Sequence, residues 1–280
     1  MGRSALEPRE TMADGAVRRR SRSELTLRVI SAVLLIPFAL FVVYQGGWWL
    51  AAGSAVFAAV MGFEWCRMAG QGPIWLAAIG LAAINLYFGI SDTLIVSLAL
   101  TAFALVFGLL HGRRFALAAF GMLYTGGLPF ALQVLREGGP WEGQAAALIL
   151  MAIVWASDSG AYFAGRGFGG PTLSADSPNK TWSGAVGAIV CSVLSGAIAA
   201  GLMDASLLVW LIFGAALSIV AQLGDLFESQ IKRRFGVKDA SGLVPGHGGI
   251  MDRVDGLGAV CVVAVAAFLA IPGLSAALGF

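Results

Sequence analysis

Residues 229–255 read SQIKRRFGVKDASGLVPGHGGIMDRVD, and this charged stretch lies between two long apolar segments. It contains basic side chains, carboxylates, one histidine and a run of glycines. Charged groups are costly close to a lipid bilayer, so a dense charged cluster between apolar segments indicates a functional site. Lys and Arg bind phosphate oxygens, Asp binds Mg²⁺, and glycine lets backbone N–H groups approach a ligand. The stretch therefore predicts a phosphate site that works with a divalent metal.

The composition of the whole chain indicates a membrane protein. Of its 280 residues 58% are hydrophobic and only 12% are charged, about half the charged fraction of a soluble domain. A helix that spans a bilayer needs about 20 mostly apolar residues. Such segments lie at 26–44, 48–66, 74–90, 93–110, 115–135, 145–164, 184–203, 206–226 and 256–275. We expect an all-α polytopic fold of about nine spans, although eight or ten also fit this hydropathy.

The chain divides into a polar basic tail, residues 1–25, and one membrane-embedded catalytic domain, residues 26–280, whose site comes mainly from 155–255. Basic residues gather in cytoplasmic loops. If the N-terminus is cytoplasmic, all of the 18 Lys and Arg residues except Arg136 fall on the cytoplasmic side. We therefore expect a multi-pass protein, of the inner membrane if bacterial, whose site faces the cytoplasm. Because the basic residues follow the membrane topology, no nucleic-acid partner is expected.

The charged stretch resembles the signature of the phosphatidate cytidylyltransferase family, also called CDP-diacylglycerol synthases. The matching residues are Ser229, Lys232, Arg233, Lys238, Asp239, Pro245, Gly246, His247, Gly248, Gly249, Asp252, Arg253 and Asp255. The resemblance is strongest between Trp155 and Asp255, and Val244 is a mild departure from it. It implies transfer of the cytidylyl group of CTP to phosphatidate, which gives CDP-diacylglycerol and pyrophosphate for phospholipid biosynthesis. It also implies a homodimer.

The resemblance implies roles for individual residues as well. It makes Asp225 and Asp252 ligands of Mg²⁺, with one or two ions bound, and Asp255 lies one turn beyond Asp252. The implied catalytic residues are Lys232, Arg233, Lys238, Asp239, His247 and Arg253, and the implied substrate-binding residues here are Ser229, Gly246, Gly248 and Gly249. Two alternatives stay open from the residues alone. Glu228 and Lys232 have the spacing of a solvated pair on one helix face, and His247 could serve as a structural hydrogen-bonding group.

A second motif runs from Asp158 to Ser183. Asp158 lies inside an apolar segment, so it needs a partner or a functional site; Arg166, two helical turns on, could form a buried ion pair with it. The run Ser-Pro-Asn-Lys-Thr-Trp places Asn179, Lys180 and Thr181 beside a predicted helix start, where free N–H groups suit a phosphate. These residues, with Asp158 and Arg166, are expected to bind substrate. Thr181 or Ser183 could equally be a helix cap, and Ser183 replaces the acidic residue usual in the family.

Three other functions compete with this interpretation. Intramembrane Asp158 and Asp225 could line the path of a transporter or channel. A CTP-dependent polyprenol kinase would transfer the γ-phosphoryl group and release CDP instead of pyrophosphate. The third alternative is an inactive scaffold, against which the intact carboxylates argue. The chain has neither a Gly-x-x-x-x-Gly-Lys-Ser/Thr loop nor a His-Glu-x-x-His motif, so P-loop and zinc-protease chemistry are not expected.

Overall fold

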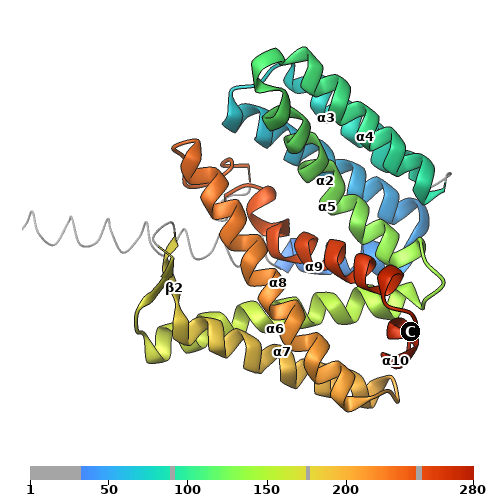
Figure 1. Ribbon diagram of the computed structural model, residues 1–280, viewed down its shortest axis with the longest axis vertical. Helices are drawn as coiled ribbons and strands as arrows, with labels where there is room; N and C mark the ends of the chain where they lie inside the picture. Colours follow the sequence, from blue (N-terminus) through green and yellow to red (C-terminus); the bar gives the residue numbers. More distant parts are fainter. Residues whose placement is uncertain (1–32, 89–91, 175–176, 244–247) are drawn as a thin grey trace, which may run out of the picture.

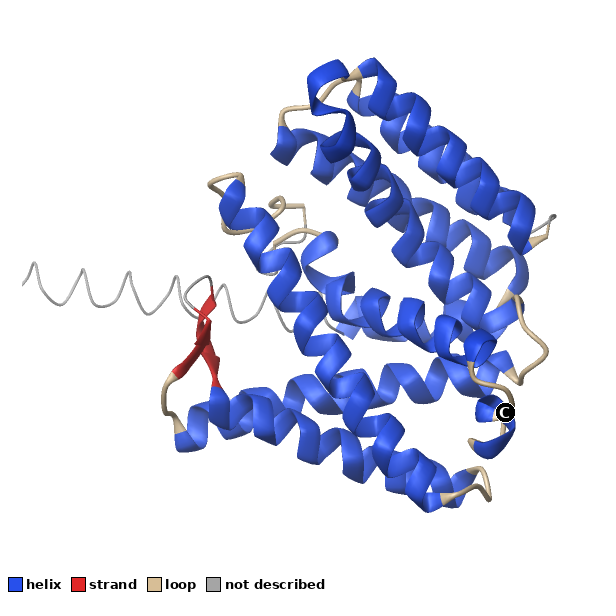
Figure 2. Ribbon diagram, viewed as in Figure 1, coloured by secondary structure: helices blue, strands red, loops and turns tan. Residues whose placement is uncertain are grey.

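The computed structural model describes residues 33–88, 92–174, 177–243 and 248–280. Within them, seven helices are long and apolar enough to cross a bilayer, by length and composition (Figure 2). They are α2 (Gly47–Ala69), α4 (Thr93–Leu110), α5 (Phe115–Glu137) with the 3-10 turn η2 (Gly112–Arg114) before it, α6 (Gly143–Phe168), α7 (Trp182–Leu202), α8 (Leu207–Arg234) and α9 (Met251–Ala270). The expected polytopic helical membrane fold is thus confirmed.

Three shorter helices complete the described part of the chain. Two of them, Val33–Gln45 and α3 (Ile74–Tyr87), are apolar, and both coincide with predicted spans. The third, α10 (Leu274–Ala277), lies at the C-terminal end. Whether the two short apolar helices also cross the bilayer decides the count of nine, which stays a prediction. The expected tail, residues 1–25, lies outside the described residues.

The structure differs from the sequence-based expectation in two places. Strands β1 (Thr172–Ser174) and β2 (Ser177–Thr181) form an antiparallel hairpin between α6 and α7, where no strand was expected. The charged stretch 229–255 is also less of a loop than hydropathy indicated, because α8 continues to Arg234 and α9 already begins at Met251. Charged side chains extend both helices because they find partners across the helix pair, as Lys232 and Asp252 do.

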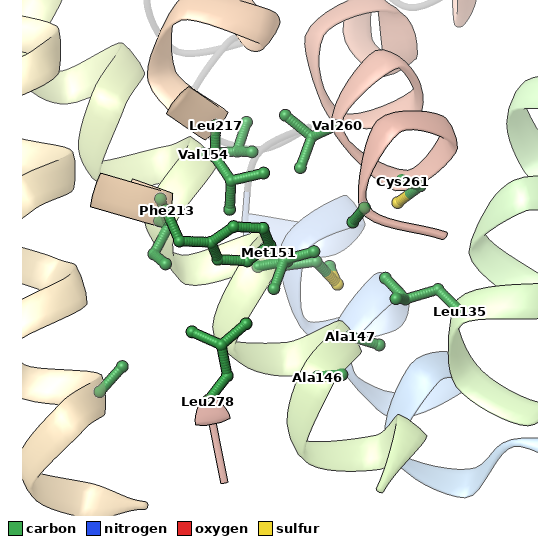
Figure 3. Close-up of a cluster of buried hydrophobic side chains, with 14 of the residues drawn as sticks. Leu135, Ala146, Ala147, Met151, Val154, Phe213, Leu217, Val260, Cys261 and Leu278 are labelled. Carbon is green, nitrogen blue, oxygen red and sulfur yellow. The ribbon is translucent and has the colours of Figure 1, made fainter. Parts of the chain in front are cut away.

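The helices form two groups that α9 joins (Figure 1). Helices α2 to α5 pack together in one group, and α6, α7 and α8 form the other. Helix α9 packs against both α5 and α8. One apolar core therefore continues across the junction, where Met151 and Val154 of α6 meet Leu217 of α8 and Val260 of α9 (Figure 3). This packing fixes α9 relative to both groups.

Several helix ends meet at one end of this bundle. Arg114 Nη1, just before α5, donates a hydrogen bond to the Ala69 carbonyl oxygen at the end of α2 (3.4 Å). Ion pairs join Lys180, just before α7, to Asp225 of α8, and Lys232 near the end of α8 to Asp252 in the first turn of α9. The polar ends of α2 and α8 and the beginnings of α5, α7 and α9 thus lie on the same side of the molecule.

Candidate active site

A cavity of about 690 Å³ lies at this polar end. Helices α6, α8 and α9, strand β2 and the loop between α8 and α9 supply its charged and polar lining, and α7 adds only small residues. On another side it is lined by apolar residues of the helix Val33–Gln45 and of α2, among them Leu35, Ile36, Ala39 and Phe57. One cavity thus offers a charged wall and a hydrocarbon wall. Asp158 and Arg253 are both exposed at the surface of the protein, so the charged wall is open on at least one side.

The cavity brings together most of the residues that the sequence selected. Its lining includes Asp158, Asn179, Lys180, Thr181, Asp225, Lys232, Asp239, Asp252, Arg253 and Asp255. These come from two motifs that are separated in sequence by the whole of α7. The predicted site residues that do not line it are Arg166, Ser229, Arg233, Lys238, Gly248 and Gly249. Gly246 and His247 lie outside the described residues.

The structure places Arg166 away from the cavity. Its Nη1 donates a hydrogen bond to the Tyr162 hydroxyl (2.8 Å), and its guanidinium carbon lies 5.9 Å from the centre of the Tyr162 ring. A buried ion pair between Arg166 and Asp158, which the eight-residue spacing allowed, is therefore wrong. The reason is that Tyr162, one turn before Arg166, is nearer on the same exposed face of α6. Asp158 and Tyr162 both line the cavity, whereas Arg166 does not.

Lys232 is the centre of a buried charged triad. Its Nζ lies 3.1 Å from Glu228 Oε1 and 2.5 Å from Asp252 Oδ1, while the side chain of Glu228 is fully buried. The solvated pair between Glu228 and Lys232 that the spacing allowed is therefore a buried one. Burial has removed hydration from these groups, so both carboxylates depend on the Lys232 ammonium group to offset their negative charge.

Asp252 organises the loop that precedes α9. Its carboxylate accepts hydrogen bonds from the backbone N–H groups of Ala240 (3.1 Å) and Gly249 (2.7 Å), in addition to that from Lys232. Gly248 precedes this contact with φ +86°, a conformation that glycine adopts without strain. Both carboxylate oxygens of Asp252 are thus occupied by protein donors. Gly248 and Gly249 were predicted to bind substrate. In the structure they form the turn that Asp252 holds in place.

The Ser-Pro-Asn-Lys-Thr-Trp motif forms β2 and the start of α7. Thr181 caps α7, since its Oγ1 accepts a hydrogen bond from Gly184 N (3.1 Å). Ser183 donates from Oγ to the Gly169 carbonyl oxygen (2.5 Å) and lies 3.0 Å from Thr181 Oγ1. An ionised carboxylate at position 183 could not donate to that carbonyl, so serine gives this chain its own link between α6 and α7. The cap leaves Lys180 at the edge of the cavity.

The donor set of the cavity suits a hard divalent cation. Its lining contains five carboxylates, those of Asp158, Asp225, Asp239, Asp252 and Asp255, against the three cations Lys180, Lys232 and Arg253. The formal charge of the lining is therefore negative, and it would repel a triphosphate unless a cation entered too. Among the described residues no group of three His, Cys, Asp or Glu side chains is arranged to hold a metal ion. Mg²⁺, however, commonly uses one or two carboxylates together with substrate phosphates and water.

Two polar features at this end of the bundle were not predicted from the sequence. Ser157 of α6 and Ser218 of α8 hydrogen-bond to each other (2.8 Å), and Gln222 donates to Ser218 (3.2 Å) beside the cavity. The other feature is Glu64 of α2, a carboxylate inside an apolar span with no exposed surface. A charged residue at such a position is itself a signal for function, and it was available in the sequence.

Fold and site together define a polytopic helical membrane protein with a charged, carboxylate-rich cavity beside an apolar wall. Comparison with known proteins gives the family: the chain belongs to the cytidylyltransferase family, whose profile matches residues 26–271. A curated phosphatidate cytidylyltransferase of Brucella suis is 38% identical over 263 residues, which cover 88% of this chain and 92% of that protein. One of Synechocystis is 33% identical over 270 residues, covering 82% and 92%. One of Helicobacter pylori is 41% identical over 116 residues, covering 41% and 44%.

Proposed function

We propose that this protein transfers the cytidylyl group of CTP to phosphatidate, giving CDP-diacylglycerol and pyrophosphate for phospholipid biosynthesis. The observation that carries the proposal is the similarity to phosphatidate cytidylyltransferases over nearly the full length of the chain. The two walls of the cavity support it physically. One substrate is a soluble triphosphate and the other is a lipid, so a shared site needs access both to water and to the bilayer.

The substrates can be placed by the chemistry of the two walls. The triphosphate of CTP and the phosphate of phosphatidate belong on the side of Lys180 and Arg253, whose cationic groups bind phosphate oxygens. The acyl chains of phosphatidate belong beside Leu35, Ile36 and Phe57, where they replace hydrocarbon by hydrocarbon. The junction of the walls is then the point at which the two phosphates meet.

The reaction joins a phosphatidate oxygen to the α-phosphorus of CTP, and the bond from that phosphorus to the bridging oxygen of the β-phosphate breaks. Pyrophosphate leaves with the electron pair of that bond. A phosphate monoester is already mostly ionised at neutral pH, because its second pKa is about 6. The attacking oxygen therefore needs no general base. What the protein must supply is the alignment of the two phosphates and compensation of their charge.

Asp225 and Asp255 are the residues that would hold Mg²⁺, and we propose that activity depends on one or two such ions. Both carboxylates line the cavity on neighbouring helices, α8 and α9. Asp252 fits a ligand role less well, since its oxygens bind Lys232, Ala240 and Gly249. When bound, the metal supplies positive charge to the phosphate oxygens. Among the side chains of the protein, Lys180 and Arg253 supply positive charge to the same phosphate oxygens.

The orientation of the cavity and the oligomeric state are also part of the proposal. The distribution of Lys and Arg supports a cavity that faces the cytoplasm, which is where CTP is available. The family resemblance supports a homodimer. The three competing functions lose support: a channel or transporter, a polyprenol kinase and an inactive scaffold each fit the match to phosphatidate cytidylyltransferases less well than the proposed enzyme.

One assay tests the reaction. The purified protein in detergent micelles is incubated with CTP, phosphatidate and Mg²⁺, and the lipid and nucleotide products are both measured. We expect equal amounts of CDP-diacylglycerol and pyrophosphate, and no product after chelation of the metal. Stoichiometric CDP would instead indicate a kinase. Activity that persists without any divalent cation would contradict the proposed metal while leaving the reaction intact.

A further inference from the structure

Glu64 is a fully buried carboxylate near the C-terminal end of α2, inside an apolar segment. A carboxylate at such a position needs strong hydrogen-bond donors. It accepts three hydrogen bonds, none from its own helix: from Ile250 N to Oε1 (3.0 Å), from Met251 N to Oε2 (2.8 Å) and from Ser241 Oγ to Oε1 (2.5 Å). Two of the donors, Ser241 and Ile250, belong to the loop that connects α8 to α9, and the third, Met251, is the first residue of α9.

These donors identify Glu64 as a helix cap supplied from a distant part of the chain. Helix α9 begins at Met251, and the residue before it, Ile250, has helical backbone angles and makes no side-chain cap. The first N–H groups of a helix have no partner inside it. Asp252 takes the N–H of Gly249, and Glu64 takes those of Ile250 and Met251. Its negative charge also lies at the positive end of the α9 dipole.

Close packing makes the contact specific. A Cβ atom added to Gly249 would lie 2.6 Å from Glu64 Oε1, so the carboxylate is pressed against bare backbone at this turn. Glu64 itself does not line the cavity, but Arg253 in the first turn of α9 and Asp255 directly after that turn do. A shift of that turn would move both side chains relative to a bound triphosphate.

We infer that Glu64 is a positioning residue for the reaction: it holds the first turn of α9, and with it Arg253 and Asp255, in place from the neighbouring helix group. The inference rests on the proposed function only for its kinetic readout. It assigns to α2, which contributes little to the charged wall, a role in the geometry of that wall.

The test compares Glu64→Gln with wild type by two measurements on the purified protein. The first is amide hydrogen exchange of peptides that cover 241–256. We expect faster exchange there, with unchanged exchange in 182–202, because an amide keeps the size of the carboxylate but loses its charge and one acceptor. The second is steady-state kinetics, for which we expect kcat to fall at least about tenfold, the scale of a small misplacement of catalytic groups, with the KM for phosphatidate within about twofold.

Glu137→Gln is a matched control. Glu137 Oε1 accepts a hydrogen bond from the Gly47 N–H at the start of α2, so it too is a carboxylate at a helix N-terminus, but one remote from the cavity lining. It should leave kcat and the exchange of 241–256 unchanged. Glu64→Asp, which keeps the charge, should recover part of the lost kcat.

The outcomes separate the inference from its alternatives. Wild-type exchange and kcat in Glu64→Gln would overturn it, and so would faster exchange with unchanged kcat, since Glu64 would then be structural only. If Glu64→Gln does not fold, Ser241→Ala removes one donor and must by itself speed exchange in 241–256 and lower kcat; wild-type behaviour of that variant overturns the inference. If wild type lacks cytidylyltransferase activity, the proposed function fails while the exchange data still test the cap.

Discussion

Lys180 Nζ on β2 lies 2.5 Å from Asp225 Oδ2 on α8, so an ion pair joins the hairpin to the helix that enters the charged stretch. The pair is only partly shielded, since the Asp225 side chain keeps 44% of its exposure. Both partners line the cavity. Each can therefore exchange the other for a ligand of opposite charge, Lys180 for a phosphate oxygen and Asp225 for a cation. Two motifs that are separate in the sequence are in this way joined at one cavity.

The first prediction concerns the carboxylates of the cavity. Asp225→Asn and Asp255→Asn each keep the size of the side chain but remove a charge that a hard cation needs. We expect either change to lower turnover at least about 100-fold, the scale of losing a strong electrostatic contribution. The measurement is CDP-diacylglycerol formation over a range of Mg²⁺ concentrations.

The control for these variants is Asp204→Asn, in the turn between α7 and α8. Asp204 has φ +48°, and asparagine tolerates this left-handed conformation about as well as aspartate. It should be nearly silent. Near-normal activity of Asp225→Asn and Asp255→Asn at low Mg²⁺ would refute the metal assignment, even if the reaction is as proposed.

The second prediction concerns the contribution of the buried triad to stability. Lys232→Met leaves the carboxylates of Glu228 and Asp252 facing each other without their cation. Breaking a buried pair by removing one partner costs about 3–5 kcal/mol. We therefore expect a clearly lower Tm and less folded protein in detergent. Glu228→Gln, which leaves the Lys232–Asp252 contact in place, should lower Tm much less. Equal thermal stability of Lys232→Met and wild type would show that the triad carries no such energy.

Hydropathy predicted most of the fold because each span is a continuous apolar segment. The predicted segment 145–164, for example, became α6, Gly143–Phe168. Hydropathy did not predict the full length of a helix that charged residues continue. Helix α8 runs on to Arg234 because Glu228 and Lys232 are buried against Asp252 of α9, a tertiary contact that no local pattern reveals. The β1–β2 hairpin was missed for a similar reason, since its short polar strands have no clear alternation.

The sequence predicted which residues belong to the site better than it predicted the role of each residue. The sequence selected the residues that line the cavity, among them Asp158, Lys180 and Asp225. It could not tell that Arg166 turns to Tyr162 or that Asp252 binds the loop before α9, because these choices depend on which neighbour is closest in space. Glu64 could have been selected as a lone carboxylate in a span, but its backbone partners Ile250 and Met251 lie 186 and 187 residues away in the sequence.

The third prediction concerns orientation. A single cysteine at Gly242, in a background without Cys66, Cys191 and Cys261, should react with a membrane-impermeant maleimide only from the cytoplasmic side. Gly242 is suitable because it is exposed and a Cβ there would meet no atom within 4 Å. The distribution of Lys and Arg gives the expected side. Labelling from the outer face of sealed vesicles would reverse the orientation and remove access of the cavity to cytoplasmic CTP.

The last prediction distinguishes two arginines that the sequence analysis treated alike. Arg253 and Arg166 are both exposed, but only Arg253 lines the cavity. A hydrogen bond to a charged group contributes about 1.5–3 kcal/mol, so Arg253→Ala should lower kcat/KM for CTP about 10- to 100-fold. Arg166→Ala removes a contact with Tyr162 on an exposed helix face and should stay within about twofold of wild type. Steady-state kinetics with saturating phosphatidate measures both. A loss in Arg166→Ala as large as that in Arg253→Ala would mean that α6 turns its C-terminal face to the substrate, and that the cavity described here is only part of the site.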